Sequence, residues 1–74
     1  MGAVNTATID VVVNGEARRV AAGASLLDLL TALDLDPRTV VVEHNRRIVR
    51  RPALGEARIA PGDAIEVVHF VGGG

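Results

Sequence analysis

The sequence predicts an α+β domain in which one helix packs against one face of a β-sheet. Residues 9–13 and 64–71 are rich in β-branched residues, which favours strands near both ends of the chain. Asn14-Gly15 follows the first run and is a strong signal for a two-residue hairpin turn. Leucines spaced three and four residues apart in residues 26–33 predict one amphipathic helix. A hairpin, one helix and then further strands favour a sheet with a helix on one side.

The first two strands form the predicted hairpin. Three apolar residues share one face of the first strand: Ile9, Val11 and Val13. The Asn14-Gly15 turn requires a positive φ at both central residues, which these two residue types tolerate. The returning strand, residues 16–20, contains Glu and Arg. These charges suit a sheet edge, because they discourage pairing with other chains.

The helix is predicted to begin after Ser25. The Ser25 hydroxyl is placed to accept a hydrogen bond from the amide of Asp28, and the spacing of the two residues is that of a capping box. Four leucines form the stripe that faces the sheet: Leu26, Leu29, Leu30 and Leu33. Asp36-Pro37 is expected to end the helix, because proline restrains the preceding residue to extended geometry.

The second half of the chain is predicted to complete the sheet. Strands are expected at residues 39–44 and 48–50, with a turn at residues 45–47 between them. Residues 52–55 are expected to form a single helical turn or a loop. The side chain of Leu54 within them is expected to be buried and to plug the hydrophobic core.

The last predicted strand, residues 64–71, leads directly into three glycines. It follows a predicted type II turn at residues 60–63, with Pro and Gly at its centre. The glycines lack Cβ atoms, so ordering them costs more backbone entropy than ordering any other residue type. We therefore expect a firm strand that carries a flexible tip with a free α-carboxylate. The expected organisation is a lead-in at residues 1–8, a domain at residues 9–71 and a tail at residues 72–74.

Composition excludes several kinds of chemistry. The chain has no Cys, so it offers no disulfide, no thiolate zinc site and no cysteine nucleophile. All eight cations are Arg, so no lysine Schiff base can form. The net charge is −1 and the single aromatic residue is Phe70, which argues against nucleic acid as a partner. No apolar run approaches the roughly 20 residues of a membrane span and no signal peptide is visible, so a cytoplasmic location is expected.

The remaining polar residues predict no catalytic, metal or nucleotide site. His44 and His69 have no Cys and no helix-spaced carboxylate beside them. Capping explains Ser25 without a catalytic triad. No phosphate-binding glycine motif precedes a helix, so no cofactor is expected to bind the chain itself. Four arginines surround the turn after the third strand, where they form a solvated edge or meet an acidic partner: Arg46, Arg47, Arg50 and Arg51.

Four segments together have a pattern that is typical of a known group. They are Val-Asn-Gly-Glu at residues 13–16, Val-Glu-His-Asn at 42–45, Pro-Gly-Asp at 61–63 and the Phe-Val-Gly-Gly-Gly ending at 70–74. With them the chain resembles, over residues 9–74, the thiamine-biosynthesis sulfur carriers of the ThiS type. The resemblance implies a ubiquitin-like β-grasp fold, with a mixed four- to five-stranded sheet packed on one main helix. It also implies the strand order 2-1-5-3-4, with strands 1 and 5 central and parallel.

The resemblance also implies a chemistry for the C-terminal carboxylate of Gly74. Such a group has a pKa of about 3.3 to 3.7, so it is ionised at neutral pH and is a poor electrophile. In the family an E1-like adenylating enzyme uses ATP to activate it. A sulfur donor such as a cysteine desulfurase then converts it to a thiocarboxylate, which supplies thiazole synthase. The chain is thus expected to be a non-enzymatic co-substrate whose tail residues Gly72 and Gly73 deliver Gly74.

Strand parity predicts a docking surface for these partners. If Ile65 of the last strand faces the helix, the residues of opposite parity point away from it. Four apolar residues are expected on that open face and are predicted to bind partners: Val12, Val41, Val68 and Phe70. The alternative is a face that is covered within the monomer or by self-association.

Three other functions remain open at the level of sequence. The small subunit of molybdopterin synthase shares the tip chemistry but has a different acceptor. A ubiquitin-like modifier would instead join Gly74 to another protein through an isopeptide bond. A simple β-grasp interaction domain would leave the tail inert.

Overall fold

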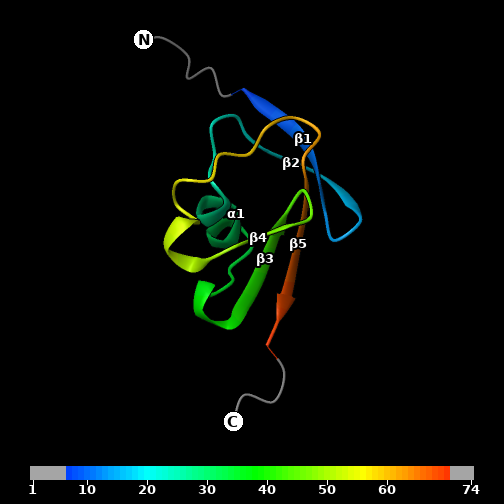
Figure 1. The fold of residues 1–74 in the computed structure, drawn as a ribbon. Coiled ribbons are helices and arrows are strands. Elements are labelled where there is room, and N and C mark those ends of the chain that lie inside the picture. The colour runs from blue at the N-terminus through cyan, green and yellow to red at the C-terminus, as the bar shows by residue number, and fades with distance from the viewer. Residues whose placement is uncertain (1–6, 71–74) are drawn as a thin grey trace.

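The computed structural model describes residues 7–70, and these form a five-stranded sheet with one α-helix packed on one face (Figure 1). The strands are β1 (Thr8–Val13), β2 (Glu16–Ala21), β3 (Val40–His44), β4 (Arg47–Val49) and β5 (Ala64–His69). The helix α1 spans Leu26–Ala32, and two 3-10 turns, η1 (Pro37–Thr39) and η2 (Arg51–Ala53), lie in the connections. The strand order β2-β1-β5-β3-β4 confirms the predicted architecture and topology.

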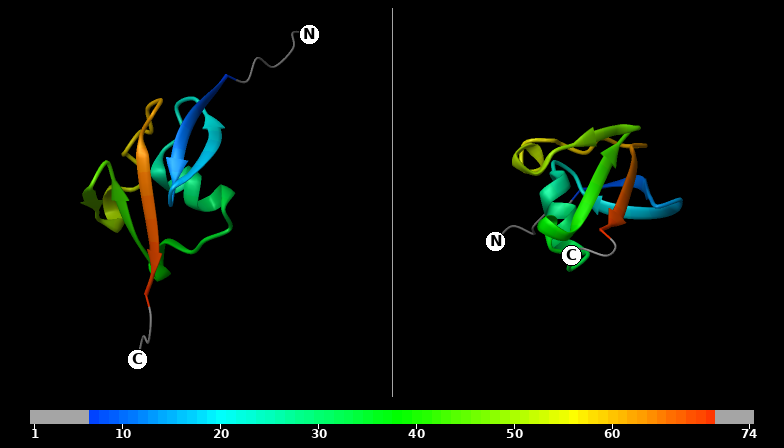
Figure 2. Two further views of the ribbon diagram at one scale, coloured as in Figure 1. Left: turned by 90° about the vertical axis from the view of Figure 1, so that its right-hand side faces the viewer. Right: turned by 60° about the horizontal axis from the view of Figure 1, so that its bottom comes forward.

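The last strand in the sequence is the central strand of the sheet. β5 pairs in parallel with β1, where Val12 lies opposite Ala64. On its other side it pairs antiparallel with β3, from Val40 opposite His69 to His44 opposite Ile65. Figure 2 shows β5 between these two neighbours. The sheet therefore depends on long-range pairing by the final strand.

The core lies between α1 and one face of the sheet. Alternate residues of the three inner strands are buried in it: Val11, Val13, Val40, Val42, Ile65 and Val67. The helix contributes Leu26, Leu29 and Leu30, whereas Leu33 is only partly buried at the edge of this cluster. Burying a side chain of this size stabilises the fold by roughly 1.5–3 kcal/mol. Leu54 is 2% exposed, which confirms its predicted role as a plug.

The predicted capping box at the start of α1 is present. The Asp28 amide donates to Ser25 Oγ at 3.1 Å, and the Ser25 amide donates to Asp28 Oδ2 at 2.9 Å. The hydrogen bonds from the Ser25 amide and hydroxyl lower the pKa of the Asp28 carboxyl. This exchange satisfies two backbone donors that a helix start otherwise leaves without partners.

The predicted helix end at Asp36-Pro37 is wrong, because α1 ends at Ala32. Asp34 has a φ of 61°, a left-handed conformation that stops the helix. The Asp34 amide donates to the Thr31 carbonyl at 3.0 Å, and the Leu35 amide donates to the Leu30 carbonyl at 2.9 Å. This is a Schellman closure with Asp in the place usually taken by Gly. Proline therefore does not end the helix but begins η1.

Several strand boundaries differ from the predictions by one residue. β1 begins at Thr8, which pairs with Ala21, so both strands of the first hairpin are longer than expected. β3 begins at Val40 rather than residue 39, because Thr39 belongs to η1. The prediction of β5 through Val71 extends outside the described residues; within them the strand ends at His69.

The second hairpin turn is shorter than predicted. Asn45 and Arg46 have φ values of 51° and 71°, so these two residues alone form the turn. Arg47 therefore belongs to β4 and pairs with His44, and the strand is Arg47–Val49 rather than residues 48–50. The first hairpin has the predicted geometry, with φ values of 51° at Asn14 and 82° at Gly15.

Candidate functional site

The candidate site begins where β5 reaches its C-terminal end. His69 pairs with Val40, and the Phe70 amide donates to the Thr39 carbonyl at 2.9 Å. The backbone is thus held by the sheet as far as Phe70. Figure 2 shows this end of β5 beside the start of β3. The predicted tail residues Gly72, Gly73 and Gly74 lie outside the described residues.

The Asn14 side chain holds β5 on the β1 side. The Val67 amide donates to Asn14 Oδ1 at 2.8 Å, and Asn14 Nδ2 donates to the Val67 carbonyl at 3.3 Å. The Asn14 backbone amide donates to the Ile65 carbonyl at 2.9 Å. The side-chain amide therefore continues the ladder beyond Val13, the last residue of β1. This contact fixes β5 three residues before Phe70.

A second asparagine holds the opposite end of β5. The Ala64 amide donates to Asn45 Oδ1 at 2.8 Å, and Asn45 Nδ2 donates to Asp63 Oδ1 at 3.1 Å. His44 Nε2 lies 2.6 Å from Asp63 Oδ2, which also accepts from the Ala60 amide at 2.8 Å. These hydrogen bonds join the β3–β4 turn to the turn that precedes β5. His44 thus has a structural role that its place in the sequence did not reveal.

Burial and hydrogen bonding act in opposite directions on Asp63. Burial raises the pKa of its carboxyl, but hydrogen bonds from Ala60, His44 and Asn45 lower it. The hydrogen bonds prevail, so the pKa of Asp63 lies below its ordinary value. The carboxylate is therefore ionised at neutral pH and acts only as an acceptor.

The sheet face opposite α1 carries an apolar surface. Val41 lies directly opposite Val68, and Ile48 pairs with Glu43, which is two residues from Val41 along β3. Cross-strand partners share a face, as do residues two apart along a strand. We call these residues the open-face patch: Val12, Val41, Ile48, Val68 and Phe70. Val68, Phe70 and Ile48 are 58%, 59% and 64% exposed, whereas Val41 is half-buried.

The structure thus places all four predicted docking residues on one face and adds Ile48 to them. The strand containing Ile48 is only three residues long. Its sequence has too few alternations to assign a face, and only the pairing with Glu43 does so. Two carboxylates also lie on this face, because Glu43 is directly opposite Glu66.

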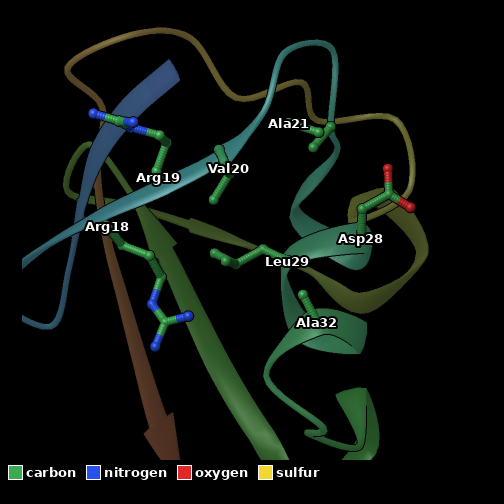
Figure 3. A pocket seen from close by; sticks show the side chains of 8 residues that line it. Arg18, Arg19, Val20, Ala21, Asp28, Leu29 and Ala32 are labelled. Carbon is green, nitrogen blue, oxygen red and sulfur yellow. The ribbon is translucent and has the colours of Figure 1, made fainter. Parts of the chain in front are cut away.

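A separate hollow of about 220 Å³ lies between β2 and α1. Figure 3 shows Arg18, Arg19 and Val20 on the β2 side, with Leu29 and Ala32 on the helix side. Arg19 forms an ion pair with Asp10, in which Arg19 Nε lies 3.3 Å from Asp10 Oδ1. None of the open-face patch residues lines this hollow, so it is not part of the candidate site.

Residues 7–70 contain no group of three His, Asp or Glu side chains arranged to hold a metal ion. In the same part of the chain, no helix is long and apolar enough to cross a bilayer.

Comparison with known proteins gives a family for this chain. The model of the ThiS family matches residues 11–74. The chain belongs to the ThiS family. It is also 40% identical over 50 residues to the sulfur carrier protein ThiS of Bacillus subtilis, covering 68% of this chain and 76% of that protein.

Two longer relatives of this ThiS-family chain are named thiazole synthase. The chain is 44% identical over 61 residues to the protein of Magnetococcus marinus and 40% identical over 63 residues to that of Paramagnetospirillum magneticum. These matches cover 82% and 85% of the chain, but the chain spans only 19% of the length of each relative.

A solved structure confirms the β-grasp fold of this ThiS-family chain. The crystal structure of the thiamine biosynthesis protein ThiS from Geobacter metallireducens superimposes with a TM-score of 0.78 at 33% identity. The match covers 89% of this chain and all of that protein. The resemblance drawn from the four sequence segments is thereby confirmed.

Proposed function

We propose that this chain is a sulfur carrier in thiamine biosynthesis, in which the C-terminal carboxylate of Gly74 becomes a thiocarboxylate. The observation that carries the proposal is the match of the ThiS family model through residue 74. The similarity to the Bacillus subtilis sulfur carrier supports it. In this role the chain is a co-substrate rather than an enzyme. The need for ATP in the activation step favours a cytoplasmic location.

The proposed activation has two steps. An E1-like adenylating enzyme joins the Gly74 carboxylate to the α-phosphate of ATP and releases pyrophosphate. With sulfide as the donor, sulfur attacks the acyl carbon, AMP leaves and a thiocarboxylate remains. With a desulfurase persulfide as the donor, the product of attack is an acyl disulfide, and a thiol reductant must cleave it to release the thiocarboxylate. The chain has no Cys, so sulfur bound covalently by this route resides on Gly74.

The proposed acceptor of the sulfur is thiazole synthase. Segments similar to this chain belong to two longer polypeptides that carry that name. Joining a carrier to the enzyme that it serves raises the effective concentration of the carrier. The same relatives favour the thiazole pathway over the molybdopterin alternative.

The described structure supports this role through the base from which the tail emerges. β5 is paired on both sides, and its amides remain hydrogen-bonded as far as Phe70. The open-face patch begins at Phe70 and continues across β5, β3 and β4. We propose that the adenylating enzyme and the synthase both bind this patch. Exposed apolar side chains that cluster on one face are a frequent mark of protein interfaces.

Intact-mass spectrometry tests the proposal. The chain is incubated with the adenylating enzyme, ATP and a sulfur donor, and the expected result is exchange of one oxygen for one sulfur. Gly73→Val and deletion of Gly74 are expected to abolish the exchange. Circular dichroism checks that these variants are folded. A full sulfur adduct on the chain without Gly74 would refute the assignment of the reactive carboxylate.

A further inference from the structure

A shallow hollow of about 190 Å³ adjoins the open-face patch at the end of β5. Its apolar lining includes Val41, Ile48 and Phe70, three members of the patch. Its basic lining consists of Arg50, which connects β4 to η2, and Arg51, the first residue of η2. The hollow thus joins an apolar surface to two guanidinium groups, four residues before the proposed reactive carboxylate of Gly74.

The charged side chains that line this hollow are both basic. Four of the eight arginines of the chain lie in residues 46–51, and residues 44–55 contain no Asp or Glu. Within residues 7–70, neither Arg50 nor Arg51 makes an ion pair or a side-chain hydrogen bond. Asp36 does not line the hollow, and its carboxylate is paired with Arg38, whose Nη2 donates to Asp36 Oδ2 at 2.9 Å.

These features match an acidic protein segment better than a polyanion. The net charge of the chain is −1, and a half-buried Glu43 and an exposed Glu66 lie on the same sheet face, so an extended polyanion such as a nucleic acid or an anionic membrane would be repelled there. The chain has Phe70 as its single aromatic residue, whereas single-strand binders stack successive bases on several aromatic side chains. An apolar floor beside two arginines is suited instead to an apolar side chain flanked by carboxylates, since Arg pairs with carboxylates in a bidentate geometry.

We propose that this hollow receives an acidic segment of thiazole synthase, with an apolar side chain of that segment seated between Ile48 and Phe70. The inference rests on the proposed function and specifies the chemistry of one contact within it. Arg50 and Arg51 pair with the carboxylates of the segment and set the orientation in which Phe70 approaches the synthase. Complementary charges at the rim of an interface act mainly on orientation and association rate.

Calorimetric titration against the thiazole synthase of the same organism tests the inference. Arg50→Glu and Arg51→Glu are compared with Arg18→Glu, which makes the same change of charge on β2, outside the hollow. Each variant at the hollow is expected to weaken binding several-fold, and the double variant by about tenfold or more. The affinity of the unchanged chain is expected to fall with added salt, and that of the double variant to fall less steeply.

The possible outcomes separate the inference from the function on which it rests. Equal affinities for the unchanged chain and the double variant would overturn the inference and leave the proposed function intact. An equal loss in Arg18→Glu would also overturn it, since the effect would then be one of net charge alone. Binding of a dT oligonucleotide that the double variant loses would assign the arginines to a polyanion instead. The chain could gain sulfur in the mass-spectrometry test and still fail to bind the synthase. That result would refute thiazole synthase as the partner but leave the carrier chemistry intact.

Discussion

Asn14 and Val67 are 53 residues apart in the sequence, yet the side-chain amide of Asn14 pairs with both backbone groups of Val67. The carboxamide presents an acceptor oxygen and a donor NH2 group side by side, so it replaces the peptide group that a longer β1 would present to β5. Asn14 also adopts the positive φ that its turn requires. One residue therefore closes the first hairpin and anchors the strand that leads to the proposed reactive end.

Removing this side chain is expected to loosen β5. Asn14→Gly keeps the turn geometry but loses both hydrogen bonds to Val67. Because Val67 is largely buried, its backbone groups are left without a replacement partner. We expect a loss of about 1–3 kcal/mol in the free energy of unfolding, measured by urea denaturation. Asn14→Asp keeps the acceptor for the Val67 amide and serves as the control. Hydrogen exchange at that amide should accelerate in Asn14→Gly and remain slow in Asn14→Asp; equal protection in both would contradict the role.

Acid is expected to weaken the anchor at the other end of β5. The pKa of Asp63 is lower in the folded chain than its ordinary value, although burial alone would raise it. A depressed folded pKa gives stability that is full above the unfolded value and is lost as the pH falls through the folded value. The unfolding free energy should therefore decrease below about pH 4. Asp63→Asn should flatten this dependence, and pH curves of the two proteins that run parallel would contradict the prediction.

Glu43 and Glu66 repel one another across β3 and β5, where they are direct cross-strand partners. Like charges in this position destabilise a sheet by roughly 0.2–1 kcal/mol. Glu66→Gln should therefore raise the free energy of unfolding by an amount in this range, and added salt should reduce the gain. Glu16→Gln, which removes a charge opposite Val13, is the matched control. Thermal melts of both variants and of the unchanged chain are measured at low and high salt. A loss of stability in Glu66→Gln would contradict the predicted repulsion.

Phe70 is expected to matter for binding and not for folding. Its side chain is 59% exposed, so Phe70→Ala should change the unfolding free energy by less than about 0.5 kcal/mol. Loss of an aromatic anchor should weaken binding to the adenylating enzyme by about tenfold or more. Leu27→Ala removes a 38% exposed residue from α1, on the other side of the sheet, and should bind normally. Activation of Phe70→Ala at the normal rate would exclude Phe70 from the interface.

Local signals were sufficient for most of the fold. The Asn14-Gly15 turn and the Ser25–Asp28 capping box depend only on neighbouring residues, and both are present. The predicted burial of Leu54 is also present, although it depends on the whole core. The α1 terminus was placed too late, because nothing in the sequence marks Asp34 as left-handed. The Schellman hydrogen bonds that hold this conformation form only once the helix exists. The docking role of the open-face patch and the chemistry of Gly74 stay predictions.

Periodicity along the chain was enough to divide each long strand into an inner and an outer face, because side chains alternate with a period of two. Periodicity cannot pair strands, so it did not bring Ile48 to Val41, set Glu43 against Glu66 or join the hollow to Phe70. Those relationships arise from the register of β5 against β3 and of β3 against β4. Register is a property of contacts between distant segments, and the long-range hydrogen bonds of Asn14 and Asn45 exist only once β5 lies between the two hairpins.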